Sequence, residues 1–117
     1  MSNAAFSLPR PEPGETGPYA LVGQARARPG KAAALERELL ALVEPTRREA
    51  GALQYHVHRD RADPDRFVFY EAWRSIADLE AHLAKPYIGA FLGKRADYLA
   101  EEMSVTWLRM ASPCPAA

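Results

Sequence analysis

The sequence predicts an α+β domain of the split βαβ type, in which helices cover one face of a four-stranded antiparallel sheet. The first observation behind this prediction is the order of the segments, which reads strand, helix, two strands, two helical segments and strand. The second is size, because a chain of 117 residues that is 48% hydrophobic usually forms one domain with a modest core. We expect that domain over residues 19–110.

The first strand is expected over residues 19–28, where it ends at a turn made by Pro29 and Gly30. A helix is expected over residues 31–49, because apolar side chains recur there at helical spacing. Pro45 lies inside this segment and should kink it or end a first segment, since proline lacks an amide proton and its ring clashes with the preceding turn.

The next segments, residues 53–59 and 66–73, are rich in β-branched and aromatic residues, and "RADPD" joins them as the turn of a hairpin. Ser75 and Asp78 have the spacing of a capping box that starts a short helix through Ala84. A further helix is expected over residues 86–102, with its proline in the first turn, and "MSVTWLRM" is the fourth strand.

Both faces of the predicted sheet carry bulky apolar groups. We assign one face to Tyr55, Val57, Val68 and Tyr70, and the other to His56, His58, Phe67, Phe69, Glu71 and Trp73. One layer of helices hides only one face, so a second copy packing sheet to sheet is the economical way to cover the other. We therefore expect a homodimer held by the first of these two faces.

Charge and the two ends of the chain limit the remaining possibilities. Lys plus Arg and Asp plus Glu number 15 each, which gives no electrostatic reason to expect nucleic acid or a membrane surface as a partner. Residues 1–18 are expected to be a flexible leader, in which Ser2, Asn3 and Ala4 resemble a remnant of cloning, and residues 111–117 a tail. Cys114 is the single cysteine, and no signal peptide or membrane span is visible, so we expect a cytoplasmic protein.

Three stretches carry a resemblance to a known family: "PGK" before the first helix, "EAGALQYHVHRD" into the second strand, and "YEAWRSIADLEAHLAKPY". Together they resemble the antibiotic biosynthesis monooxygenase domain family, with a Glu-x-Trp-x-Ser then Leu-x-x-His arrangement made by Glu71, Trp73, Ser75, Leu79 and His82. The resemblance implies a dimeric ferredoxin-like α+β barrel. It is strongest to the small quinol monooxygenases, which implies catalysis without a metal or flavin.

The family is functionally mixed, so its site residues are compared one position at a time. Trp73 matches a tryptophan of the polyketide-oxidising members, whereas their asparagine and tyrosine correspond here to Phe69 and Leu79. Haem-degrading members have an asparagine, a tryptophan and an axial histidine where this chain has Gly23, His82 and Leu92. We therefore expect no haem, because its axial ligand is missing.

His82 is the candidate catalytic base, since an imidazole with an unperturbed pKa of about 6.5 suits proton transfer near neutral pH. A structural role for this histidine is an equal alternative. Trp73 is the second candidate catalytic residue, and Phe69, Glu71, Tyr87, Phe91 and His56 are the candidate pocket residues. Glu71 requires a partner in the fold, either a structural salt bridge, which is slightly favoured, or a place in the site. His56 and His58 could form a metal pair, but we expect no metal.

These observations predict a monooxygenase without a cofactor that acts on a quinol or polycyclic phenol with dioxygen. A phenol of this kind becomes a good electron donor to dioxygen only after deprotonation, which is the role given to His82. Two alternatives stay open. One is an isomerase of a small carbonyl metabolite, and the other is a non-catalytic dimeric protein for small-molecule binding or stress response, which gains if side chains fill the pocket.

Overall fold

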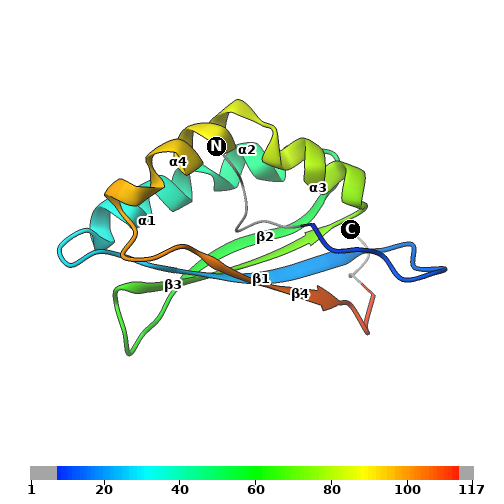
Figure 1. Ribbon diagram of the computed structural model, residues 1–117, viewed down its shortest axis with the longest axis horizontal. Helices are drawn as coiled ribbons and strands as arrows, with labels where there is room; N and C mark the ends of the chain where they lie inside the picture. Colours follow the sequence, from blue (N-terminus) through cyan, green and yellow to red (C-terminus); the bar gives the residue numbers. More distant parts are fainter. Residues whose placement is uncertain (1–7, 114–117) are drawn as a thin grey trace.

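The structure is a computed structural model that describes residues 8–113. Two layers make up the domain, with the helices on one face of a single sheet and the opposite face left open (Figure 1). The elements in chain order are β1 (Tyr19–Arg26), α1 (Ala32–Ala41), α2 (Val43–Arg47), β2 (Ala52–Arg59), β3 (Arg66–Trp73), α3 (Ile76–Leu83), α4 (Pro86–Lys94), the 3-10 turn η2 (Arg95–Asp97) and β4 (Ser104–Arg109).

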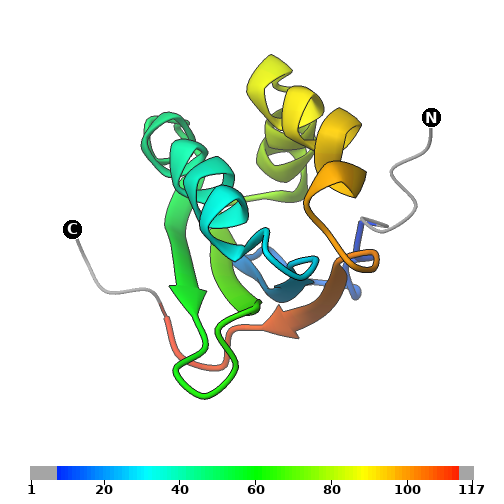
Figure 2. The same ribbon diagram turned by 90° about the vertical axis from the view of Figure 1, so that its left-hand side faces the viewer.

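The sheet has the strand order β2-β3-β1-β4, and each neighbouring pair is antiparallel. Seen from the side, α1 and α2 form one row above the sheet and α3 and α4 form a second row beside it (Figure 2). This arrangement is the predicted ferredoxin-like α+β fold with a four-stranded antiparallel sheet, and that part of the fold-class prediction is confirmed, whereas the dimeric barrel stays a prediction. None of the helices within residues 8–113 has the length and hydrophobicity needed to cross a membrane.

The helix predicted over residues 31–49 is divided near Pro45, as expected. The first part, α1, ends at Ala41, and the second, α2, begins at Val43 and places Pro45 in its first turn. Proline fits there because an amide in the first turn of a helix has no carbonyl partner within that helix. The division lets α2 end in a turn that leads directly into β2, and Glu49 lies in this turn.

The helix α3 begins where the sequence predicts, because the Ser75 hydroxyl caps it. Ser75 Oγ accepts a hydrogen bond of 3.1 Å from the Asp78 amide and donates one of 2.8 Å to the Asp78 carboxylate. The following helix is shorter than predicted: α4 ends at Lys94 instead of continuing to residue 102. The chain then returns to the end of β1, where Ala27 and Leu99 form a bridge, and this tertiary pairing takes precedence over the helical spacing.

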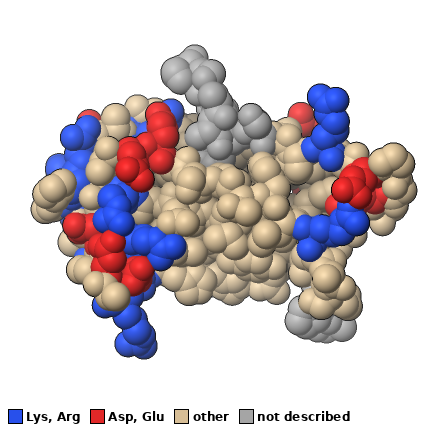
Figure 3. All heavy atoms as spheres, turned by 60° about the horizontal axis from the view of Figure 1, so that its bottom comes forward, with Lys and Arg blue, Asp and Glu red and all other residues tan. Residues whose placement is uncertain are grey.

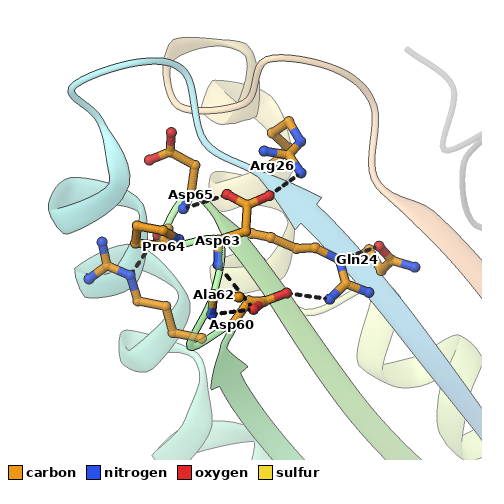
Figure 4. A network of polar contacts seen from close by, with 9 residues as sticks. Gln24, Arg26, Asp60, Ala62, Asp63, Pro64 and Asp65 are labelled. Atoms are coloured by element: carbon orange, nitrogen blue, oxygen red, sulfur yellow. Dashed lines mark hydrogen bonds and ion pairs between the residues drawn. The ribbon is translucent and has the colours of Figure 1, made fainter.

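The β2–β3 hairpin is held by a network of charged side chains around its loop (Figure 4). Asp60 Oδ1 accepts the amides of Ala62 and Asp63 at 2.8 and 3.1 Å, and its Oδ2 accepts Nη1 of Arg66 at 2.8 Å. Arg26 of β1 adds a 2.6 Å ion pair to Asp63. With residues 61–65 as the loop, Asp60 therefore pairs with Arg66, and the Asp60 amide donates to the Arg66 carbonyl at 2.9 Å.

This pairing corrects the predicted faces of β2. Tyr55 lies opposite Glu71 and Val57 opposite Phe69, so odd-numbered residues of both strands share the face below the helices. His56 and His58 lie opposite Tyr70 and Val68 on the open face. The prediction that placed Tyr55 and Val57 with Val68 and Tyr70 was wrong by one residue, and a slip of one residue moves every side chain of a strand to the other face.

The described part of the leader, residues 8–18, forms no helix and no strand of the sheet. Glu12 and Glu15 in this segment both pair with Arg109 at the end of β4. The Tyr19 hydroxyl donates a 3.3 Å hydrogen bond to the Glu15 carbonyl at the start of β1. Residues 2–4 and Cys114, on which the sequence analysis also commented, lie outside the described residues.

Candidate active site

A narrow apolar cavity lies between the helices and the covered face of the sheet. Its volume is about 50 Å³, and most of its wall consists of aromatic and aliphatic side chains from α1, α3, α4 and the four strands, among them Phe69, Phe91 and Trp107. Glu71 and His82 contribute a carboxyl group and an imidazole to this wall, and these are its groups whose unperturbed pKa values lie below about 7. An apolar cavity with a few convergent polar groups is the usual form of a small-molecule site.

Gly23 makes room for the ring that forms one wall of this cavity. A Cβ atom built on Gly23 of β1 would lie 2.0 Å from Cζ of Phe69, so any side chain at this position collides with the ring. Phe69 lies opposite Gly23 on the neighbouring strand β3. The glycine therefore leaves space over β1 for the far end of the Phe69 ring, which lines the cavity.

His82 enters the site from α3 and is 3% exposed. Its Nδ1 atom lies 2.9 Å from Oε2 of Glu49, and no residue within 8–113 makes a hydrogen bond with its Nε2 atom. The ring of Trp73 packs on the imidazole with centroids 4.5 Å apart. Burial lowers the pKa of His82 below its usual value, although the carboxylate of Glu49 acts in the opposite direction. A neutral imidazole is thus favoured near neutral pH.

Glu49 is a site residue that the sequence analysis did not single out. Its Oε2 atom accepts hydrogen bonds from both His82 and the hydroxyl of Tyr87, which comes from α4. The pKa of Tyr87 is raised to about 12 by burial and by its hydrogen bond to Glu49, so this hydroxyl remains a donor. The sequence places Glu49 at the end of an amphipathic helix among charged residues, where an exposed carboxylate is the usual expectation.

Glu71 is 7% exposed, and its Oε1 atom accepts a 2.9 Å hydrogen bond from Nε1 of Trp73. The salt bridge that the sequence favoured for Glu71 is absent among residues 8–113, where the indole is its hydrogen-bond partner. Burial raises the pKa of Glu71 to about 7, with a further contribution from the nearby charge of Glu49. Glu71 can therefore either accept or donate a proton inside the cavity near neutral pH.

The structure brings together most of the predicted site residues. His82, Trp73, Glu71 and Tyr87 belong to one connected cluster, and Phe69 and Phe91 line the cavity beside it. Trp73 is fully buried behind His82 and is not itself part of the cavity wall. Tyr55, which the sequence analysis placed on the wrong face, lines the cavity with its ring 5.9 Å from that of His82.

His56 lies apart from this cluster, on the open face of the sheet. Its Nδ1 atom is 3.2 Å from Nη2 of Arg47, and its Nε2 atom is 2.6 Å from Oε1 of Gln54. His58 lies beside it, with ring centroids 6.3 Å apart, but neither histidine is on the side of Glu71 and His82. The predicted place of His56 in the pocket was therefore wrong, because the register of β2 directs this residue away from the helices.

Comparison with known proteins agrees with this geometry. The model of the family described as "Antibiotic biosynthesis monooxygenase" matches residues 18–94, which contain β1 to α4 and every residue of the cluster around His82. The chain belongs to the antibiotic biosynthesis monooxygenase family. The resemblance that the sequence analysis found is thereby confirmed.

Several known proteins are similar to this member of the antibiotic biosynthesis monooxygenase family in sequence or in fold. PA3566 from Pseudomonas aeruginosa is 39% identical, with a TM-score of 0.78 over 85% of this chain and 100% of that one. "Putative monooxygenase Rv0793" from Mycobacterium tuberculosis is 30% identical over 80% of this chain and 91% of its own length, and its solved structure has a TM-score of 0.78. "Uncharacterized protein sll1783" from Synechocystis is 30% identical over 91% of this chain and 76% of its own length.

Proposed function

We propose that this family member is a monooxygenase that oxidises a quinol or polycyclic phenol with dioxygen, without a metal or organic cofactor, and that His82 is its base. The observation that carries the proposal is the state of His82, a buried imidazole whose Nε2 atom has no hydrogen-bond partner among the described residues while its ring lines an apolar cavity. Membership of the family and similarity to "Putative monooxygenase Rv0793" support the same reaction class.

In the proposed reaction Nε2 of His82 accepts the proton of a substrate hydroxyl. The resulting phenolate gives electrons to dioxygen far more readily than the phenol does. One oxygen atom enters the ring and the other leaves as water, so that a quinol becomes a hydroxyquinone and itself supplies all the electrons. The protein's contribution is to remove the proton and to hold the ring in an apolar environment.

The other predicted residues have separate proposed roles in this site. Trp73 packs against His82 and holds its ring, and Glu71 offers an oxygen to a second hydroxyl of the substrate. Phe69 and Phe91 provide flat apolar surfaces on which an aromatic ring can stack. A volume of about 50 Å³ is small beside ligand pockets of roughly 300–1,000 Å³, so side chains must separate for a ring to enter. This favours a quinol with few rings over a polycyclic phenol.

Oxygen consumption by the metal-free protein tests the proposal across a panel of benzohydroquinones, naphthohydroquinones and anthrones. We expect turnover of at least one of them, and His82→Ala should lower its maximal rate by about two to four orders of magnitude, as expected for a positioned base. Arg48→Ala is the control, because Arg48 follows α2, is exposed, and lies outside both the cavity wall and the open face of the sheet. If the maximal rate of His82→Ala stays within a factor of about three of the rate of the unchanged protein, the assignment of His82 as the base is contradicted.

The small cavity also favours a second candidate function, a non-catalytic module that binds a small molecule. In that case the protein consumes no oxygen above the uncatalysed rate with any compound of the panel. The oxidised form of one of these compounds, a quinone, should instead bind to the protein with a heat that calorimetry measures. The isomerase alternative would use His82 and Glu71 as base and acid. It is distinguished by conversion of a carbonyl substrate under argon, with no oxygen consumed.

We also propose that the protein acts as a homodimer through the open face of the sheet. Figure 3 shows that the middle of this face carries neither acidic nor basic side chains, which gather instead at its two ends. Val22, Val68 and Tyr70 are only half-buried there, and Leu108 is 40% exposed. A broad apolar face of this kind is typical of an interface.

A further inference from the structure

Glu49 occupies a position from which it controls the histidine proposed as the base. It lies in the turn between α2 and β2, and its side chain is only 10% exposed. Its partner His82 is 33 residues further along the chain, on α3. A buried carboxylate requires hydrogen bonds in compensation, and Oε2 of Glu49 obtains them from His82 and Tyr87.

The contact between Glu49 and His82 determines which ring nitrogen holds the proton. An ionised carboxylate can only accept hydrogen bonds, so the proton of a neutral His82 lies on Nδ1, which faces Glu49 at 2.9 Å. Nε2 then has a free lone pair. The second ring nitrogen is thus left in the form that can take a proton from a ligand in the cavity.

The remaining neighbours hold the ring but do not select its tautomer. Trp73 packs on one side of the imidazole, with an angle of 39° between the planes, and Tyr55 meets its edge at 61°. Neither makes a hydrogen bond to His82. The titratable or charged groups around His82 are Glu49 from the turn, Lys85 after α3, Tyr87 from α4, Tyr55 from β2 and Glu71 from β3.

We infer that Glu49 is a positioning residue for the proposed reaction, which holds His82 with Nδ1 protonated and Nε2 open to the substrate and is itself held by Tyr87. The inference rests on the proposed function. When Nε2 takes the substrate proton, the ring becomes an imidazolium beside the Glu49 carboxylate, and the negative charge stabilises it. The same arrangement of acid and histidine serves serine hydrolases, where removing the acid's charge lowers the rate by about four orders of magnitude.

Nitrogen NMR of the full-length labelled protein tests the tautomer without any substrate. We expect the neutral His82 ring to show a protonated Nδ1 and an unprotonated Nε2. In Glu49→Gln the pKa of His82 should fall, because the contribution that raises it is lost while burial remains. A neutral ring protonated at Nε2 in the unchanged protein would overturn the inference, whatever the activity.

Oxygen consumption with a naphthohydroquinone provides the second arm of the test. Glu49→Gln should lower the maximal rate by about two to four orders of magnitude with little change in KM, since it acts through the base and not on binding. Glu44→Gln is the matched control, because this carboxylate is exposed on α2 and forms an ion pair with Arg48, at 3.8 Å. Tyr87→Phe should have a smaller effect in the same direction.

The outcomes separate this inference from the proposed function. If His82→Ala abolishes turnover and Glu49→Gln leaves it within a factor of about three, His82 is the base and Glu49 does not position it. If neither variant changes the rate, the base assignment fails and the inference fails with it. An activity that Glu49→Asp restores in part, relative to Glu49→Gln, supports a role for the charge and not for the length of the side chain.

Discussion

Trp73 and Glu71 are joined by a 2.9 Å hydrogen bond from the indole Nε1 to the carboxylate Oε1, although both belong to the same strand, β3. Residues two apart on a strand project from the same face, so the pair lies side by side under the helices. The bond places a carboxyl group inside an apolar cavity and fixes the indole against His82. The two candidate site residues therefore act as one unit.

Trp73→Phe breaks this unit while keeping a ring against His82. The carboxylate of Glu71 loses its hydrogen-bond donor, and a buried acceptor without a partner costs about 1–3 kcal/mol. The loss should also raise the pKa of Glu71 above about 7, because the indole hydrogen bond acts to lower it. Chemical denaturation measures the first effect and carboxyl carbon NMR the second. An unchanged titration of Glu71 would show that the bond does not form in solution.

Glu71 should make the protein less stable as the pH rises. Its pKa is about 7 in the folded protein against 4.5 for the free group, so the folded state binds the proton more tightly than the unfolded state. This contribution to stability is complete below pH 4.5 and is lost between pH 4.5 and 7. The change is on the order of 3 kcal/mol.

Glu71→Gln isolates that contribution, because the amide is similar in shape and does not titrate. The free energy of unfolding, measured by denaturation at pH 5 and pH 8, should fall with pH more steeply in the unchanged protein than in the variant. His82 acts in the opposite direction, because its lowered pKa in the folded state makes the protein less stable as the pH falls. This histidine is present in both proteins, so its effect cancels in the comparison. Parallel pH profiles for the two proteins would refute a raised pKa at Glu71.

Gly23→Ala should destabilise the domain by about 1–3 kcal/mol, the usual cost of overpacking a core. The added Cβ would lie 2.0 Å from Cζ of Phe69, so the ring must leave its place in the cavity wall. Gly89→Ala on α4 is the control with the opposite sign. Its Cβ meets nothing within 4 Å, and alanine is the better helix former by about 1 kcal/mol. Thermal denaturation of both variants compares them; equal melting temperatures would argue against the close approach of Phe69.

Tyr70→Glu tests the proposed dimer. This residue is half-buried near the middle of the open face, and a carboxylate there would lose its water if two such faces packed together. We expect the unchanged protein to scatter light as a dimer at low micromolar concentration and the variant to scatter as a monomer. Leu40→Glu is the control, since Leu40 is 50% exposed on α1, on the helical side. A dimer that persists in Tyr70→Glu would place the interface elsewhere.

The sequence by itself determined the order of the elements, the start of α3 and the family. These depend on local features: apolar spacing, the proline in α2, the Ser75 cap, and the short run that contains Trp73 and His82. Each is readable because the residues that interact are only a few positions apart.

Only the tertiary structure decided the faces of β2, the early end of α4 and the partner of His82. The loop contacts of Asp60 with Arg66 set the register of β2, and the pairing of Leu99 with Ala27 takes the chain out of α4. Glu49 and His82 meet across 33 residues, and no local pattern distinguishes this glutamate from the exposed charged residues just before it in the sequence. Register and long-range pairing depend on how separate segments pack, and hydrophobic spacing within one segment does not contain that information.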